Sequence, residues 1–90
     1  MLNLVVKRNG QDQKFDAKKL YASVYASLIA SKVRHKEAEL ISEEVTKLTR
    51  RSIDNKSHVS SHSLRIEAAK HLRDYNNLAA YIYMHHRILS

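Results

Sequence analysis

The chain has 90 residues, of which 43% are hydrophobic, enough for one domain with a modest core. It contains no cysteine, which excludes disulfides, thiol nucleophiles and thiolate metal sites. Sixteen lysines and arginines against nine acidic residues give a net charge of +7, which favours a nucleotide, a nucleic acid or an acidic protein surface as partner, although a basic surface can also serve solubility alone.

The first predicted element is a β-hairpin. Residues 2–7 alternate between apolar and mostly polar side chains, from Leu2 and Leu4 to Val6, with the period of two that is typical of a strand. Asn9-Gly10 then favours a tight turn, because both central positions of a type I′ turn need a positive φ. Residues 12–15 are expected to form the returning strand.

Four helices are predicted after the hairpin. Asp16 is a suitable N-cap for the first, which is expected to begin at Ala17. In each helix, apolar residues recur every three or four positions, so that they share one face. The residues expected on these faces are Leu20, Val24 and Leu28 in the first helix, Ala38, Ile41, Val45 and Leu48 in the second, Leu64, Ala68 and Leu72 in the third, and Leu78, Ile82 and either His85 or Leu89 in the fourth.

The segment between the second and third helices predicts a loop over residues 54–57 and a short third strand over residues 58–60. Ser60 or Ser61 then caps the third helix, and the asparagines within residues 74–77 suit a cap for the fourth. A hairpin leaves one apolar face that another layer must cover. We therefore predict a single domain over residues 1–90 with an α+β fold, a four-helix bundle capped by a small three-stranded β-sheet made of the N-terminal hairpin and the short third strand.

Basic residues gather where the hairpin meets the first helix. Lys18 and Lys19 lie in the first helical turn, where a cation costs stability unless an anion binds nearby. The helix start offers unpaired backbone N–H groups, and the turn at Asn9-Gly10 exposes others beside Lys7 and Arg8. This pattern predicts a phosphate site, although a solvated basic hairpin is an equally good interpretation. Arg50 and Arg51, by contrast, are expected on a solvated stretch of the second helix.

The order of several motifs resembles the ATP-cone domain, a regulatory nucleotide-binding module of many ribonucleotide reductase large subunits and of the repressor of their genes. The matching segments are Val5-Val6-Lys7-Arg8-Asn9-Gly10, Phe15-Asp16, Lys19-Leu20, Val59-Ser60-Ser61 and the alanine- and tyrosine-rich run from Leu78 to Tyr83, followed by Arg87. Neither a reductase barrel nor a zinc ribbon accompanies them, so we expect either an excised domain or a free-standing cone.

The resemblance implies a non-enzymatic sensor that binds ATP or dATP, with or without Mg²⁺. By that resemblance Val5 or Val6 lines the base pocket, Lys7, Arg8 and Lys19 hold phosphates, Asp16 contacts the base or sugar, and Ser61 offers a hydroxyl to phosphate. Gln13 stands where many relatives are acidic, and the basic or histidine position of the third helix falls at Arg65, with His62 close by. The candidate nucleotide-binding residues are Val5, Val6, Lys7, Arg8, Asn9, Gly10, Gln13, Asp16, Lys19, Ser61 and Arg65.

Other readings remain open. A small nucleic-acid-binding protein and a ligand-free protein-interaction bundle are the two alternatives to a nucleotide sensor. Residues 83–89 are rich in apolar and aromatic side chains. They indicate either a contact patch, which would serve self-association or the binding of a separate regulated protein, or packing against the hairpin. His58 and His62 straddle a strand-to-helix junction and His85-His86 diverge on a helix, so we expect no metal site.

No catalytic motif is visible, and we expect no enzymatic activity because no nucleophile elbow accompanies the serines and histidines. The sequence has no apolar run long enough to span a membrane and no signal-peptide core. A cytoplasmic location is therefore expected.

Overall fold

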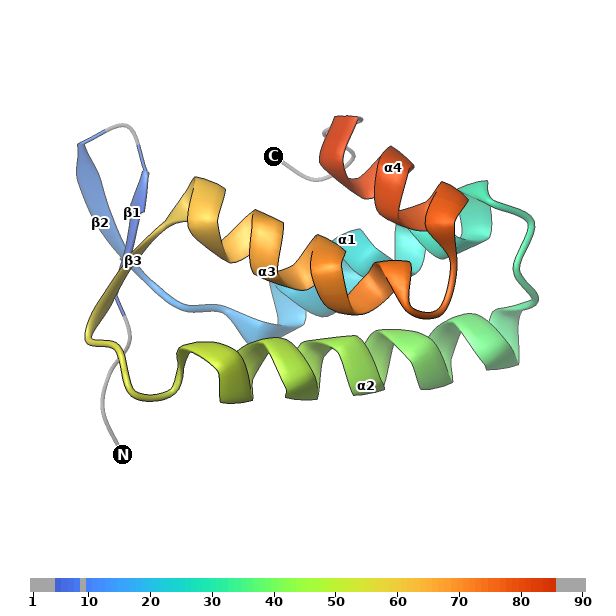
Figure 1. The fold of residues 1–90 in the computed structure, drawn as a ribbon, viewed down its shortest axis with the longest axis horizontal. Coiled ribbons are helices and arrows are strands. Elements are labelled where there is room, and N and C mark those ends of the chain that lie inside the picture. Colours follow the sequence, from blue (N-terminus) through green and yellow to red (C-terminus); the bar gives the residue numbers. More distant parts are fainter. Residues whose placement is uncertain (1–4, 9, 86–90) are drawn as a thin grey trace.

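The computed structural model describes residues 5–8 and 10–85, and of Val5, Lys7 and Arg8 it describes the backbone only. The predicted strand residues Leu2 and Leu4, the turn residue Asn9, and residues 86–90 lie outside this description. Within it, the chain is mostly helical (Figure 1). The elements are β1 (Val5–Arg8), β2 (Gln11–Lys14), α1 (Ala17–Ala30), α2 (His35–Ile53), β3 (His58–Ser60), α3 (Ser61–Arg73) and α4 (Asn77–His85).

The strands lie together at one end of the helices (Figure 1). β1 pairs antiparallel with β2, and because Arg8 is opposite Gln11 the connecting turn has two residues. Gly10, at φ +77°, adopts the positive φ expected of the turn. β1 also pairs in parallel with β3, where Val6 is opposite Val59 and both side chains are buried. The strand order β2-β1-β3 therefore ties the hairpin to the segment that enters α3.

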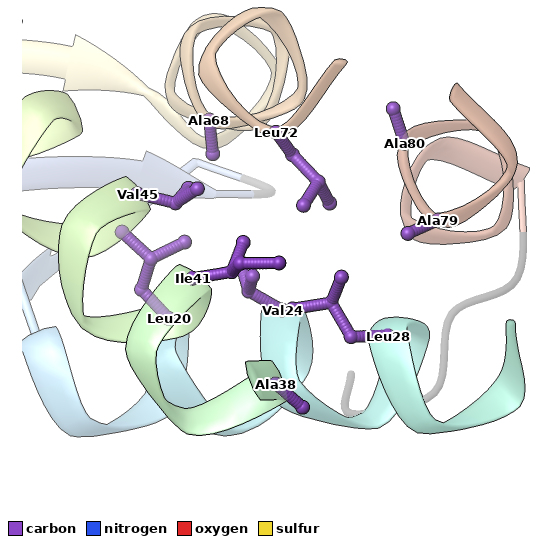
Figure 2. Close-up of a cluster of buried hydrophobic side chains, with 10 residues drawn as sticks. All are labelled: Leu20, Val24, Leu28, Ala38, Ile41, Val45, Ala68, Leu72, Ala79 and Ala80. Carbon is purple, nitrogen blue, oxygen red and sulfur yellow. The ribbon is translucent and has the colours of Figure 1, made fainter. Parts of the chain in front are cut away.

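The four helices pack in a closed cycle, as α1 contacts α2 and α4, and α3 also contacts α2 and α4. Figure 2 shows side chains from the four helices meeting in one core, with Leu72 of α3 facing Val24 and Ile41. Most of the predicted core residues are in it. The buried cluster consists of Leu20, Val24, Leu28, Ala38, Ile41, Val45, Ala68, Leu72, Ala79 and Ala80.

The prediction for the core face of α4 is wrong within the described residues, and its alternative residue Leu89 lies outside them. Leu78 is 56% exposed, Ile82 is half-buried and His85 is exposed, whereas Ala79 and Ala80 are buried. Alanine has a small side chain, so burying it lets the α4 backbone approach α1 and α3 closely, and this turns Leu78 outward. Two further predicted core residues, Leu48 of α2 and Leu64 of α3, are only half-buried.

Local capping fixes where the helices begin. The carboxylate of Asp16 caps α1 as predicted, and the Ser60 hydroxyl caps α3 by accepting a hydrogen bond from the Ser63 N–H at 3.0 Å. Asn76 caps α4, since its Oδ1 accepts from the Ala79 N–H at 2.8 Å. In the part of the chain that the structure describes, none of the helices has the length and hydropathy needed to cross a membrane.

Candidate functional site

A cavity of about 210 Å³ lies where the sheet end of the molecule meets the helices. Its walls come from β1, β2, α1, α3 and α4, so segments from both ends of the described chain contribute to it. The lining residues are Val6, Gln13, Lys14, Phe15, Asp16, Lys19, Leu20, Ser23, Ser61, Leu64, Arg65 and Tyr83.

Many of the predicted site residues line this cavity. They are Val6, Gln13, Asp16, Lys19, Ser61 and Arg65. His62, considered as an alternative to Arg65, is exposed and is not among the lining residues. Gly10 is exposed at the hairpin turn, outside the lining. The side chains of Val5, Lys7 and Arg8, and the whole of Asn9, lie outside the described residues.

The charge of the cavity wall is mainly positive. Lys14, Lys19 and Arg65 contribute three basic side chains, and Asp16 is the single acidic residue among the described lining residues. Asp16 Oδ1 accepts hydrogen bonds from the backbone N–H groups of Lys18 and Lys19 at 3.0 and 3.2 Å. The expectation of unpaired N–H groups at this helix start is therefore wrong for these two residues, because the cap already satisfies them. An anion in the cavity would be held by basic side chains instead.

The α3 side of the cavity carries a hydroxyl beside a cation. Because Ser60 caps the helix, Ser61 becomes its first residue and lines the cavity, one turn before Arg65. Positions four apart lie on the same helix face, which explains why these two residues reach the same space. The same spacing on α1 brings Ser23 beside Lys19.

Tyr83 brings α4 into the site. Burial raises the pKa of the Tyr83 phenol to about 12, and the nearby Arg65 guanidinium opposes that rise. The phenol is therefore neutral over the ordinary pH range. Tyr83 also packs against the core, as does Phe15, which lies near the other end of the sequence. The apolar part of the wall is completed by Val6, Leu20 and Leu64.

Sequence reasoning missed several lining residues. Lys14, Ser23 and Leu64 were given no binding role, and Phe15 and Tyr83 entered only as parts of a resemblance. A signal existed for Ser23, since it stands one helical turn after Lys19. No comparable signal existed for Tyr83, because its place in the cavity depends on how α4 docks.

A serine, a histidine and a glutamate meet between α2 and α3, away from the cavity. His71 Nε2 lies 2.8 Å from Ser52 Oγ and 3.8 Å from Glu67 Oε1. A catalytic relay needs the serine and the carboxylate on opposite nitrogens of the imidazole, whereas here both approach the same one. This group therefore links two helices and lacks the geometry of a catalytic triad. Across residues 5–8 and 10–85, the histidines and acidic residues form no cluster of three suited to a metal ion.

The fold and cavity define a small, mostly helical domain with a basic ligand pocket. A family model described as ATP cone domain matches residues 3–88, and the chain therefore belongs to the ATP-cone domain family. Membership makes it a nucleotide-binding domain with a regulatory rather than a catalytic role, in a family that binds adenine nucleotides. No curated protein and no solved structure matches the chain significantly.

Proposed function

We propose that the chain is an allosteric sensor that binds ATP or dATP in the cavity described above and performs no chemistry itself. The observation that carries this proposal is that Lys14, Lys19 and Arg65 line one cavity whose wall combines polar and apolar residues. Small-molecule sites combine apolar walls with a few polar groups that fix orientation. Basic side chains facing one space favour an anionic ligand, and charge-assisted hydrogen bonds to phosphate are among the strongest polar contacts.

The size of the cavity suggests how the nucleotide lies. At about 210 Å³ it is smaller than the roughly 300 Å³ at the lower end of ordinary ligand pockets. We propose that it encloses only the base and sugar, which lie in the apolar part, near Val6 and Leu20, with Gln13 and Asp16 as polar contacts. The phosphates lie toward Lys19, Arg65 and the Ser61 hydroxyl.

The hairpin completes the phosphate site in this proposal. Lys7 and Arg8 are the last two residues of β1, directly before the turn to β2. Both strands border the cavity, through Val6 of β1 and through Gln13 and Lys14 of β2. Asn9, which lies outside the described residues, and Gly10 stay predicted contacts of the outer phosphates. Mg²⁺ can accompany the nucleotide with phosphate oxygens as its ligands, because the described residues supply no cluster of carboxylates to hold it directly.

The regulatory output is proposed to pass through α4. Tyr83 lines the cavity, and positions two apart lie on nearly opposite faces of a helix, so Tyr81 points away and is 58% exposed. Leu78, three residues before Tyr81, is exposed on the same side. We propose that α4 can pack in two arrangements and that the nucleotide binds one of them more tightly. Binding then changes how this outer face contacts a second copy of the chain or a separate protein. The proposed setting is a ribonucleotide reductase or its transcriptional repressor.

Calorimetry tests the proposal most directly. ATP, dATP, GTP and a short DNA duplex are titrated into the chain at moderate salt, with and without Mg²⁺. We expect saturable binding of ATP and dATP, weaker binding of GTP, and little binding of duplex. If the duplex binds more tightly than ATP and its affinity falls steeply with salt, the basic surface serves nucleic acid instead. If no titrant binds, the interaction-bundle alternative is left.

A further inference from the structure

The guanidinium of Arg50 lies over the aromatic ring of Phe15. Arg50 Cζ is 5.7 Å from the ring centroid, within the range of a cation–π contact. Phe15 lines the cavity and packs against the core, whereas Arg50 belongs to α2, which contributes no residue to the described cavity lining. The expectation that Arg50 lies on a purely solvated stretch is therefore incomplete, because this exposed residue contacts the cavity wall from outside.

The position of Phe15 in the chain makes this contact informative. Phe15 falls between the end of β2 at Lys14 and the helix cap at Asp16, where the backbone belongs to neither a strand nor a helix. Side-chain packing therefore holds its ring, which contacts the core and has the Arg50 guanidinium over its face. Arginine suits this role because its planar group stacks on an aromatic face more readily than the compact ammonium of lysine.

We propose that Arg50 is a positioning residue, which holds the Phe15 ring in place as a wall of the nucleotide cavity and so raises nucleotide affinity without touching the nucleotide. The inference rests on the proposed function. It differs from a simple contribution of positive charge, because Arg51 carries the same charge at the next position. Neighbouring positions on a helix point about 100° apart, and Arg51 is exposed and has no cation–π contact with an aromatic ring of the described residues.

A double-mutant cycle separates the two explanations. ATP affinity is measured by calorimetry for Arg50→Gln, Phe15→Leu and the double variant, with Arg51→Gln as the matched control for loss of one charge. We expect Arg50→Gln to weaken ATP binding by about two- to fivefold, the range expected of an exposed cation–π contact. Arg51→Gln should change affinity clearly less. In the Phe15→Leu background, Arg50→Gln should have no further effect, because the ring on which it acts is absent.

A second measurement compares ATP with AMP. The effect of a diffuse charge grows with the charge of the ligand, whereas a positioned ring affects the shared adenosine part equally. Arg50→Gln should therefore weaken ATP and AMP by the same factor. Arg50→Lys keeps the charge but loses the flat face, and should reproduce most of the loss even if Phe15→Leu fails to fold.

Several results would overturn the inference. Equal losses for Arg50→Gln and Arg51→Gln, additivity in the cycle, or a larger loss for ATP than for AMP would each assign Arg50 to diffuse charge. A lower melting temperature with unchanged affinity would reduce the contact to ordinary packing. Absence of ATP binding by the unaltered chain is a different result, since it removes the proposed function itself and the inference with it.

Discussion

The carboxylate of Asp16 accepts a hydrogen bond from the backbone N–H of Lys19, with Oδ1 3.2 Å from that nitrogen, while the side chains of both residues line the same cavity. Asp16 thus fixes the start of α1, and Lys19 contributes to the cavity wall from that fixed start. The cap also neutralises part of the positive field of the helix end. The geometry of the cavity therefore depends on a local hydrogen bond between residues three positions apart in the sequence.

Asp16→Ala removes both hydrogen bonds of the cap, and we expect it to lower the free energy of unfolding by about 1 kcal/mol. Asp16→Asn keeps a capping oxygen and should cost much less. Urea unfolding measures both. Equal stability of the two variants would show that the cap is energetically irrelevant. If Asp16 also contacts the base or sugar, Asp16→Asn should lower ATP affinity while stability is nearly unchanged.

Gly10→Val places a β-branched side chain at φ +77°. No atom lies within 4 Å of the added Cβ, so the cost comes from backbone strain and not from a clash. We expect a loss of about 1 kcal/mol or more in unfolding free energy and weaker ATP binding through the distorted hairpin. Gly10→Asn is the control, because asparagine tolerates a positive φ and should cost less. An unaltered melting temperature and affinity in Gly10→Val would contradict the role of the turn.

Lys19→Ala should lower ATP affinity at least about tenfold, because a charge-assisted contact to phosphate is typically worth about 1.5–3 kcal/mol. Arg8→Ala is expected to act similarly through the hairpin. Lys36→Ala, in the first turn of α2 at the other end of that helix from Arg50, controls for loss of one exposed positive charge. Calorimetry at two salt concentrations measures all three. Equal weakening in every variant would favour diffuse attraction and the nucleic-acid alternative.

The stability of the fold should fall at high pH because of Tyr83. Its pKa is raised to about 12, so the folded chain keeps the phenol proton at pH values where the unfolded chain, with a pKa near 10.0, loses it. The contribution is complete below about pH 10 and is lost as the pH rises toward 12, with a magnitude on the order of 2 kcal/mol. In urea unfolding across this pH range, the free energy of unfolding should decline less steeply for Tyr83→Phe than for the unaltered chain. Tyr81→Phe, at an exposed position, should decline like the unaltered chain.

Nucleotide binding is expected to change self-association through the outer face of α4. Sedimentation velocity without ligand, with ATP and with dATP should give different distributions of monomer and small oligomer. Leu78→Ser and Tyr81→Ser should abolish the difference, and because both residues are exposed each should alter stability by less than about 0.5 kcal/mol. Identical distributions over a wide concentration range would exclude self-association and leave a separate protein as the partner.

Local features of the fold could be predicted from the sequence. Asp16 predicted the start of α1, and the single glycine predicted the turn, because caps and tight turns depend on a few neighbouring residues. The core faces of α1, α2 and α3 largely followed from helical spacing. The core face of α4 did not follow from it. Leucine is more hydrophobic than alanine, which favours burial of Leu78, but the smaller side chain of Ala79 allows closer packing of the helices.

The cavity was predictable only in part. Lys19, Ser61 and Arg65 could be proposed from a family pattern, but the contact between Arg50 and Phe15 could not, since it joins two elements far apart in the sequence. The same holds for Tyr83. The patch expected at residues 83–89 stays a prediction, because only Tyr83, Met84 and His85 of it belong to the described chain. Leu78 and Tyr81, which were not part of that expectation, are the exposed large apolar residues of α4 among the described residues.

The cavity joins Val6, in the first described strand, to Tyr83, in the last helix. A pocket built from such distant parts of the chain exists only after the slow, non-local contacts of folding have formed. Intermediates in which α4 has not yet docked lack one wall, and we expect them to bind nucleotide poorly. A ligand of this pocket therefore stabilises the completed fold against both the unfolded chain and its partly folded forms. During synthesis and turnover, the cellular nucleotide pool would then protect finished chains from proteolysis while leaving incomplete ones open to it.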